Sequence, residues 1–338
     1  MTSQRPTPTL QDVASRAGVS TATVSRAINF PDQVASTTRS KVNAAIAALG
    51  YSPNFGARAM AARRTNTIGA IIPTMENAIF ARGLQAFQEE LRSNGFTMLV
   101  ASTAYQPTTE EEQIRSLVAR GADALLLIGY HRDPAIYDFL DAQGVPVLLT
   151  WAFDPEAARP SVGFNNSAAM QAMAQKVIEM GHRRLALISA ETAQNDRASG
   201  RRDGIKRAMT VASLNSDALC FVETKYGIDE GAAAFDEVMA QEPRPTAVFC
   251  GNDVLAVGAL RRARERGIAV PGEVSIIGFD DIELAQVVYP ALTTVHVPHR
   301  EMGRKAGQAL VKLLRDGVAL EPIEVQTRPV FRGTLGPV

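Results

Sequence analysis

Short apolar runs alternate with helix-length segments from Thr67 onward, and this alternation constrains the fold more than any other feature of the sequence. The runs have the composition of strands: "IGAII" (68–72), "TMLVAS" (97–102), "ALLLIG" (124–129), "VPVLLT" (145–150), "RLALIS" (184–189), "TAVFC" (246–250) and "VSIIGF" (274–279). Strands that alternate with helices form parallel sheets covered on both faces. Because the region is too long for one core, the sequence predicts an α/β body of two doubly wound lobes with a cleft between them.

The first 65 residues have a different pattern, typical of short helices. Thr9 is placed to cap the helix "LQDVASRA", and Gly18 to end it. Ser20 is the expected N-cap of "TATVSRAI". A third helix is expected in "STTRSKVNAAIAALG", with Ser36 as its N-cap and Gly50 as its stop. The sequence thus predicts a small all-α head.

The charge of the chain is divided between these two regions. The whole chain has a net charge of zero. Residues 1–65 nevertheless hold eight Lys and Arg, two Asp and no Glu, which gives +6, so the remainder carries −6. A small basic head on an acidic body indicates a polyanionic partner for the head alone.

The stretch "VSTATVSRAIN" (19–29) indicates which surface of the head meets that partner. On a helical wheel, at about 100° per residue, one arc consists of Thr21, Ala22, Ser25, Arg26 and Asn29. We expect the opposite arc to form a core, consisting of Val24 and Ile28 together with Val13 and Ala17. Short side chains let a helix approach the DNA major groove, and an arginine reaches guanine O6 and N7. The pattern predicts a helix-turn-helix; the alternative is a three-helix docking or oligomerisation module.

Several classes of protein are excluded by what the sequence lacks. It has no run of about 18 uncharged apolar residues that would span a membrane, and its start has no apolar segment typical of a signal peptide, so we expect a cytoplasmic protein. Cys220 and Cys250 have no CxxC partner and are expected to be buried, reduced thiols. The four histidines are scattered, and no catalytic or dinucleotide-binding motif occurs. We expect no metal, no cofactor and no enzymatic activity.

The motif "LQDVASRAGVSTATVSRAIN" resembles the DNA-binding head of the LacI/GalR family, which includes the lactose and purine repressors. The resemblance continues through "TRSKVNAAIAALGYSPNFGARAM", "RPTAVFCGNDVLAVGAL" and "VSIIGFDDIELAQVVYPALTTVHVP". It implies a transcriptional repressor with a periplasmic-binding-protein-like body. The expected divisions are a head (1–53), a hinge helix and linker (54–65), an N-lobe (66–164 plus 295–325) and a C-lobe (165–294 plus 326–338).

The resemblance also assigns roles to residues of the head. Its base-reading positions are Thr21, Ala22 and Arg26. Its phosphate-contacting positions are Ser20, Thr23, Asn29, Arg39 and Tyr51. Ala22 offers only an apolar contact, for instance to a thymine methyl, so Arg26 should supply most of the hydrogen-bonded readout.

Residues 54–62 match the hinge helix of the family, which orders on operator DNA and enters the minor groove. The positions expected at that groove are Asn54, Ala57, Arg58, Met60 and Ala61. Met60 stands where the family carries a leucine that wedges apart the central base step, and a flexible apolar methionine suits the same use. The alternative is a linker helix with a solvated basic end.

In the body the resemblance implies a small effector bound between the lobes. The expected effector residues are Phe80, Trp151, Asn195, Arg197, Arg201, Tyr226, Asn252 and Asp280. Aromatic faces suit the apolar side of a sugar or purine, and arginine, aspartate and amide groups bind hydroxyls or a carboxylate. Trp151 follows the strand "VPVLLT", at a cleft edge, although a core or interface tryptophan is the alternative. Asp253 either joins this set or caps the next helix.

The same residues bear on the identity of the effector. Asn195 and Arg197 depart from the purine-repressor pattern, and Arg197 with Arg201 favours an acidic ligand. "SVGFNNSAAM" is similar to gluconate-type repressors, so we expect a sugar or sugar acid. We further expect a homodimer that forms through the body, binds a pseudo-palindromic operator and associates with the bacterial nucleoid. The alternatives are a solute-binding protein without a regulatory role and an α/β enzyme acting on sugars.

Overall fold

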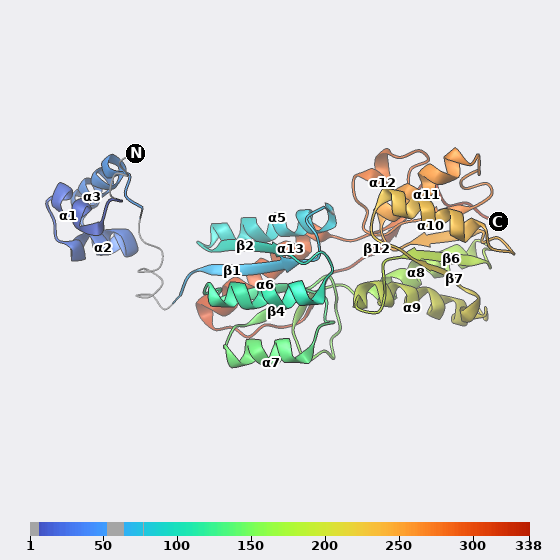
Figure 1. Ribbon diagram of the computed structural model, residues 1–338, viewed down its shortest axis with the longest axis horizontal. Helices are drawn as coiled ribbons and strands as arrows, with labels where there is room; N and C mark the ends of the chain where they lie inside the picture. The colour runs from blue at the N-terminus through green and yellow to red at the C-terminus, as the bar shows by residue number, and fades with distance from the viewer. Residues whose placement is uncertain (1–6, 53–63, 77) are drawn as a thin grey trace. The chain divides into compact units, whose positions relative to one another are not determined.

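The computed structural model describes residues 7–52, 64–76 and 78–338. The chain divides into two compact units, Met1–Thr65 and Asn66–Val338 (Figure 1). The first unit is helical and the second is α/β, which confirms the fold class predicted from the sequence. The predicted minor-groove positions Asn54, Ala57, Arg58, Met60 and Ala61 lie outside the described residues.

The first unit, the head, contains helices α1 (Leu10–Ala17), α2 (Thr21–Asn29) and α3 (Ser36–Leu49), with the 3₁₀ turn η1 (Pro31–Gln33) before α3. Thr9 caps α1 in a capping box with Asp12, and Ser20 caps α2 by accepting from Thr23 N. Gly18 ends α1 in the left-handed conformation. The fully buried centre of the head is Val13, Val24 and Val42.

The predicted N-cap of α3 is wrong by one residue. Ser36 is already helical, and Ala35 occupies the cap position without a side-chain hydrogen bond. Ala35 is the last residue with an extended ψ, of 141°, so the helix begins directly after it. The carbonyl of Ser36 accepts the hydroxyl of Ser40 inside the helix. The first turn of α3 therefore lacks the cap that α1 and α2 have.

This difference predicts unequal effects of two alanine substitutions. Thr9→Ala removes the hydroxyl that accepts from Asp12 N, although the bond from Thr9 N to the Asp12 carboxylate stays, and it should lower the stability of the head by about 0.5–2 kcal/mol. Ser36→Ala, the matched control, removes no capping bond and should cost less than about 0.5 kcal/mol. Hydrogen exchange of the α1 and α3 amides in the full chain measures both. Equal protection losses in the two variants would contradict the assignment of the caps.

In the second unit, the body, the described residues contain a parallel six-stranded sheet with the order β11-β5-β4-β3-β1-β2. Its strands are β1 (Thr67–Ile72), β2 (Thr97–Ser102), β3 (Ala124–Ile128), β4 (Val147–Thr150), β5 (Ser161–Gly163) and β11 (Ile323–Glu324). Its helices are α5 (Ala78–Ser93), α6 (Pro107–Ala119), α7 (Pro134–Ala142) and α13 (His299–Asp316). We call this sheet with its helices the first lobe.

Successive side chains along a strand point to opposite faces of the sheet, and in the first lobe apolar side chains pack on both faces. Ile68, Ala70 and Ile72 pack with α5 and α13 in one apolar cluster, while Ile71 packs with α6 and α7 in another. Burial on both faces explains why these strands are apolar throughout rather than at every second residue. Helices α5 and α13 are far apart in the sequence but lie side by side (Figure 1).

The second lobe is built around a parallel four-stranded sheet with the order β7-β6-β8-β9. Its strands are β6 (Leu185–Ser189), β7 (Cys220–Glu223), β8 (Ala247–Cys250) and β9 (Ser275–Ile277). Its helical elements are α8 (Asn166–Glu179), α9 (Asp196–Val211), η2 (Ser216–Ala218), α10 (Ile228–Met239), α11 (Asp253–Glu265) and α12 (Leu284–Val287). Two clusters again cover the two faces, one including α8 and α9 and the other α10 and α11.

Strands β10 (Thr294–His296) and β12 (Arg328–Val330) pair with each other in an antiparallel ribbon. The chain passes between the two sheets after β5, after β9 and after β11; on the last passage Thr334 returns to bond with Ile276 of β9. The strands predicted from apolar runs are all present. The strands β5, β7, β10, β11 and β12, of two to four residues each, were not predicted.

The two cysteines are free thiols with different exposure. Cys250 is buried in β8, as predicted, whereas Cys220 is only half-buried. The prediction of two buried thiols is wrong for Cys220 because β7 is an edge strand of its sheet. Among the described helices none is long and apolar enough to cross a membrane.

Candidate functional site

The described part of the head presents one polar helix face. In α2, Val24 and Ala27 are buried, while Ala22 and Arg26 are exposed one turn apart. Thr21, the third predicted base-reading residue, is half-buried at the start of the same helix. The side chain of Arg26 makes no hydrogen bond or ion pair with the described residues, and α2 has no acidic residue in its first turn. This face is therefore free to meet a partner.

The predicted phosphate-contacting residues are held in different ways. Ser20 and Thr23 bond to each other, with 2.9 Å between their hydroxyl oxygens. Asn29 donates to Ser25 Oγ at 3.3 Å. Arg39 lies 3.9 Å from Asp32, and the ring of Tyr51 packs partly against the core of the head. Local contacts thus fix the direction of several of these polar side chains before any partner binds.

In the body, the eight predicted effector residues line a single cavity between the lobes: Phe80, Trp151, Asn195, Arg197, Arg201, Tyr226, Asn252 and Asp280. Ile79, Tyr105 and Phe164 complete its wall and were not predicted. Most of these residues follow the carboxyl end of a strand, among them Trp151 after β4, Asn252 after β8 and Asp280 after β9. Parallel sheets place such residues at one edge, where ligands bind.

The ring of Trp151 occupies space that a side chain would fill if the neighbouring helix α5 did not have a glycine, Gly83, at this position. Its backbone is in the left-handed region, with φ 59°, and its ring lies 5.3 Å from Phe80 and 6.2 Å from His299 between centroids. A Cβ on Gly83 of α5 would lie 2.6 Å from Cη2 of Trp151. A Cβ on Gly303 of α13 would lie 1.9 Å from the carbonyl oxygen of Gly83. These two glycines allow the close approach of α5 and α13 beneath the tryptophan.

Arg201 is the most firmly held cation of the cavity. It donates to Asn166 Oδ1 at 3.0 Å and to Tyr226 Oη at 3.1 Å, and its guanidinium lies 4.8 Å from the ring centroid of Phe279. Asn166 in turn donates to the carbonyl of Trp151 at 2.9 Å. Asn166 links residues of both lobes; it belongs to the stretch "SVGFNNSAAM", but it was not among the effector residues expected from the sequence. Arg201 is thus preorganised, which lowers the entropic cost of holding a ligand.

Four buried polar atoms of the cavity residues have no hydrogen-bond partner among the described residues. They are Trp151 Nε1, Arg201 Nε, Asn252 Nδ2 and Asp280 Oδ2. Each such atom costs about 1–3 kcal/mol while it remains unpaired. Three donors and one acceptor form a set that hydroxyl groups can satisfy, because a hydroxyl both donates and accepts.

Asp280 is a carboxylate in an apolar setting. Burial raises its pKa well above the usual range, and the Arg201 guanidinium opposes that rise. His299 Nε2 lies 3.6 Å from Asp280 Oδ1, and burial lowers the pKa of His299 to about 3, so this histidine is neutral. Asp280 also has a φ of 106°, an uncommon conformation for an aspartate. Strain and burial at one residue are typical of a binding site.

Asp253 lies behind the cavity rather than in its wall. It accepts from Thr294 Oγ1 at 2.6 Å and from Ile282 N at 2.8 Å, and burial raises its pKa to about 7. The N-cap of α11 is Asn252, whose Oδ1 accepts from Leu255 N at 2.9 Å. The alternative that Asp253 caps this helix is therefore wrong. Its carboxylate instead fastens the start of α11 to the loop after β9.

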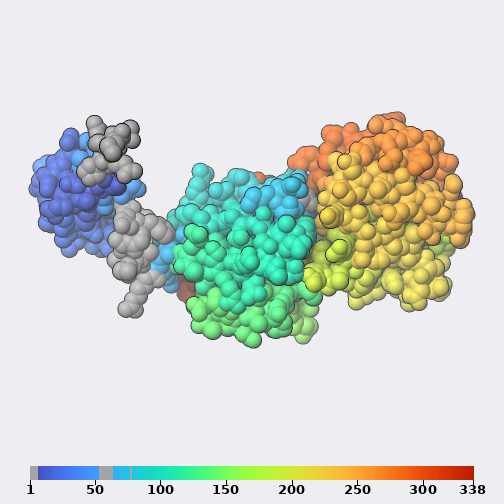
Figure 2. Space-filling view, viewed as in Figure 1, coloured from blue at the N-terminus to red at the C-terminus, as the bar shows by residue number. Residues whose placement is uncertain are grey.

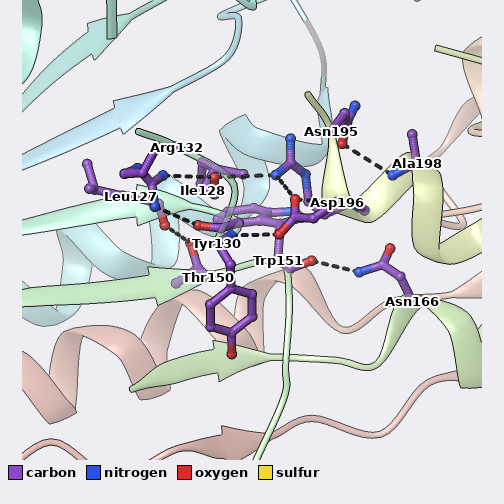
Figure 3. Close-up of polar contacts among 12 residues, drawn as sticks. Leu127, Ile128, Tyr130, Arg132, Thr150, Trp151, Asn166, Asn195, Asp196 and Ala198 are labelled. Carbon is purple, nitrogen blue, oxygen red and sulfur yellow. Dashed lines mark hydrogen bonds and ion pairs between the residues drawn. The ribbon is translucent and has the colours of Figure 1, made fainter. Parts of the chain in front are cut away.

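Polar contacts close the cavity on the side of β3 and α9 (Figure 3). Asp196 Oδ2 accepts from Tyr130 N at 2.6 Å, and Arg197 donates to the Ile128 carbonyl at 3.3 Å and to Asp196 Oδ1 at 2.8 Å. A Cβ on Gly129 would lie 2.0 Å from a terminal nitrogen of Arg197. We call this the β3–α9 contact.

The cavity itself is almost closed. About 20 Å³ remains between its side chains, enough for about one water. On the face shown in Figure 2, segments of the two lobes meet at the surface of the body. A ligand of sugar size therefore requires the lobes or the side chains to move apart.

A helix-turn-helix head joined to a two-lobed α/β body with a polar cavity defines the class of ligand-responsive DNA-binding regulators. The comparisons agree. The sequence profile of the bacterial regulatory proteins of the lacI family matches residues 9–54, and that of the periplasmic binding protein-like domain matches residues 174–335.

Two relatives match over most of their length. The chain is 34% identical over 313 residues to the HTH-type transcriptional repressor PurR of Vibrio atlanticus, covering 91% of this chain and 92% of the relative. It is 33% identical over 308 residues to the HTH-type transcriptional regulator GntR of Pseudomonas aeruginosa, covering 91% and 89%. The chain therefore belongs to the lacI family of bacterial regulatory proteins. It is a DNA-binding transcriptional regulator with an effector-binding body, and not an enzyme.

Solved structures of the family have the same fold. A LacI-family regulator from Silicibacter pomeroyi superposes with a TM-score of 0.88 at 28% identity, covering 97% of this chain and 99% of that one. The lac repressor dimer bound to operator and the anti-inducer ONPF gives 0.86 at 25% identity, with the same coverage. The regulator CelR in complex with cellobiose gives 0.70 at 29% identity, again with 97% and 99% covered.

Proposed function

We propose that this regulator is a repressor that binds a pseudo-palindromic operator as a homodimer, and that a sugar or sugar acid bound between its lobes controls operator affinity. The observation that carries the proposal is the convergence of the eight effector residues, from both lobes, on one buried cavity with unpaired polar atoms. The effector would act through its different affinities for the open and closed arrangements of the lobes.

The DNA-binding part of the proposal rests on α2. Arg26 is assigned the main hydrogen-bonded base contact, with Thr21 and Ala22 beside it, because it is exposed and free of partners in the described head. The predicted phosphate residues would fix the register of α2 on the duplex without reading sequence. Met60 remains the proposed minor-groove wedge.

The proposed dimer forms through the body. The edge strand β2 exposes Leu99 and Val100. The end of α12 exposes Val287, and the segment after it exposes Tyr289 by 90%. Exposed strand edges and apolar groups are typical of surfaces that pair with another copy. The proposed lobe boundaries are those expected from the sequence, 66–164 plus 295–325 and 165–294 plus 326–338.

The effector part rests on the chemistry of the wall. Trp151 and Phe80 offer aromatic faces to the apolar side of a sugar ring. Arg201 Nε and Asn252 Nδ2 are donors for a carboxylate or hydroxyl, and Asp280 accepts from a hydroxyl. The charge of Arg197 is balanced by Asp196, 2.8 Å away, so Arg201 is the residue that we expect to select a sugar acid. The structurally similar CelR was solved with a sugar, cellobiose.

Trp151 is the only tryptophan of the chain and lines the cavity, so its fluorescence reports directly on this site. A titration of the full-length protein with neutral sugars and sugar acids, paired with thermal shifts, tests the proposal. We expect at least one member of the panel to change the fluorescence and raise the melting temperature. A panel without any such member would contradict the assignment of the effector.

One substitution separates ligand binding from stability at this site. Asn252→Ser keeps a good N-cap for α11 but removes the unpaired Nδ2 donor, so we expect the effector affinity to fall by up to about tenfold. Asn165→Ser is the matched control, because Asn165 caps α8 in the same way, through Ala168 N, and does not line the cavity. Equal effects of the two variants on effector affinity would place the effector elsewhere.

A further inference from the structure

A second, larger cavity adjoins the effector cavity, with most of its wall in the first lobe and with Gln194 and Arg197 from the second. It measures about 530 Å³, within the range of small-molecule sites. Tyr105 and Arg197 belong to the walls of both cavities. Beyond these two residues the wall includes Gln106, His131 and Gln194. We call this space the outer compartment.

The outer compartment lies at the topological switch point of the six-stranded sheet. In the order β3-β1-β2, the chain leaves β1 for β2 on one side and later adds β3 on the other. Pro73, Thr103 and His131 of the wall come soon after the ends of β1, β2 and β3. A crevice opens at such a point because successive connections run to opposite faces of the sheet, and ligands bind there.

Arg132 in this wall is buried and already neutralised. Its side chain is 1% exposed, and it pairs with Glu110 at 3.2 Å and donates to the Gly129 carbonyl at 3.0 Å and to Tyr137 Oη. Its Nε makes no hydrogen bond with the described residues. The wall also includes the acidic residues Glu111 and Asp133. The compartment is therefore polar without excess positive charge, which disfavours an anionic occupant such as a phosphate.

The remaining wall groups suit an uncharged, hydroxyl-rich occupant. Gln106 and Gln194 are exposed amides that both donate and accept. The ring of Tyr105 lies 5.6 Å from that of Tyr226, at the boundary between the two cavities. Such a ring provides an apolar face of the kind that packs on sugar C–H groups. A molecule that fills the effector cavity can extend past Tyr105 without losing polar contacts.

We propose that the outer compartment is a second subsite that takes an additional neutral, polyhydroxylated unit, so that the effector consists of at least two sugar-sized units. This inference rests on the proposed function of the effector cavity. It narrows the class of effector from single sugars or sugar acids to molecules in which a second sugar unit is linked to the first. The second unit contributes affinity through the amides of Gln106 and Gln194.

The test compares one-unit and two-unit ligands on the full-length protein. Calorimetric titration measures the affinity of each sugar or sugar acid that binds, the parent, and of its glycosides, in which a neutral sugar unit is linked to that parent. We expect one glycoside to bind at least tenfold more tightly than its parent. The double variant Gln106→Ala/Gln194→Ala should abolish that gain and leave the affinity of the parent unchanged. Neither amide side chain makes a hydrogen bond with the described residues, and both lie on the surface, so the variant should stay folded.

The outcomes separate this inference from the function on which it rests. Asn252→Ser should weaken both ligands, because both occupy the effector cavity. Glycosides that bind no more tightly than their parents, or a gain that survives the double variant, would overturn the second subsite while leaving the effector cavity in place. A full panel without binding would overturn the proposed effector, and this inference with it.

Discussion

Arg26→Ala should weaken operator binding by about five- to 150-fold and relax the preference for one base pair in each half-site. The reason is that a bidentate arginine contact to guanine is worth about 1–3 kcal/mol of discrimination. Ala22, the exposed neighbour of Arg26 on α2, offers no hydrogen bond to replace it. Fluorescence polarisation against the operator and against variants with each base pair exchanged measures the effect.

The control for this prediction is Arg16→Ala. Arg16 is also exposed, lies in the last turn of α1 and carries the same charge, but it is not on the reading helix. Its loss should reduce binding to all sequences by a similar factor and lower the salt dependence. If Arg26→Ala behaves in the same way, with unchanged base preference, then Arg26 contacts phosphate rather than a base edge.

Gly129→Ala should weaken effector binding more than tenfold, because it prevents the β3–α9 contact. The new methyl would lie 2.0 Å from Arg197 and 2.5 Å from the carboxylate of Asp196. Both side chains would have to move and would lose their bonds to the Ile128 carbonyl and to Tyr130 N. Hydrogen bonds to charged groups are worth about 1.5–3 kcal/mol each, so the arrangement in which the eight predicted effector residues line one cavity becomes less stable. Trp151 fluorescence titration measures the loss.

Gly144→Ala is the matched control for backbone strain. Gly144 has a φ of 63°, close to the 71° of Gly129, but a Cβ there would meet nothing within 4 Å. Both variants therefore carry the same cost of about 1–2 kcal/mol for alanine in the left-handed region, while only one disturbs the contact between the lobes. Similar effector affinities in the two variants would show that the β3–α9 contact does not hold the ligand-bound state.

The sequence predicted the fold well where its pattern was repeated over many residues. The longer strands, such as β3, are apolar throughout because helices cover both sides, and the caps at Thr9 and Ser20 follow directly from local chemistry. Ser36 was placed wrongly, because Ala35 and Ser36 offer two adjacent starts for α3 and only the backbone conformation chooses between them. Strands of two or three residues, such as β11, are determined by pairing with distant partners.

The candidate site was likewise predicted only in part. The resemblance to the family placed eight residues that the structure brings to one cavity, although their roles stay predictions. Tyr105 and Asn166 were missed, because each takes part through a contact with a residue far away in the sequence, Tyr226 and Arg201 respectively. Gly83 and Gly129, which lie against cavity residues, were also missed. Each has to be glycine because another group lies where its side chain would be, and only the structure shows that group.

The central claim is that a ligand in the effector cavity controls operator binding, and one measurement tests it most directly. Operator affinity of the full-length protein is measured across a titration of the effector found by Trp151 fluorescence, for the native chain and for Asn252→Ser. We predict that saturating effector changes the operator Kd at least tenfold, and that Asn252→Ser shifts the required effector concentration upward by about the loss in its effector affinity. An operator Kd that stays constant while the cavity fills would contradict the claim.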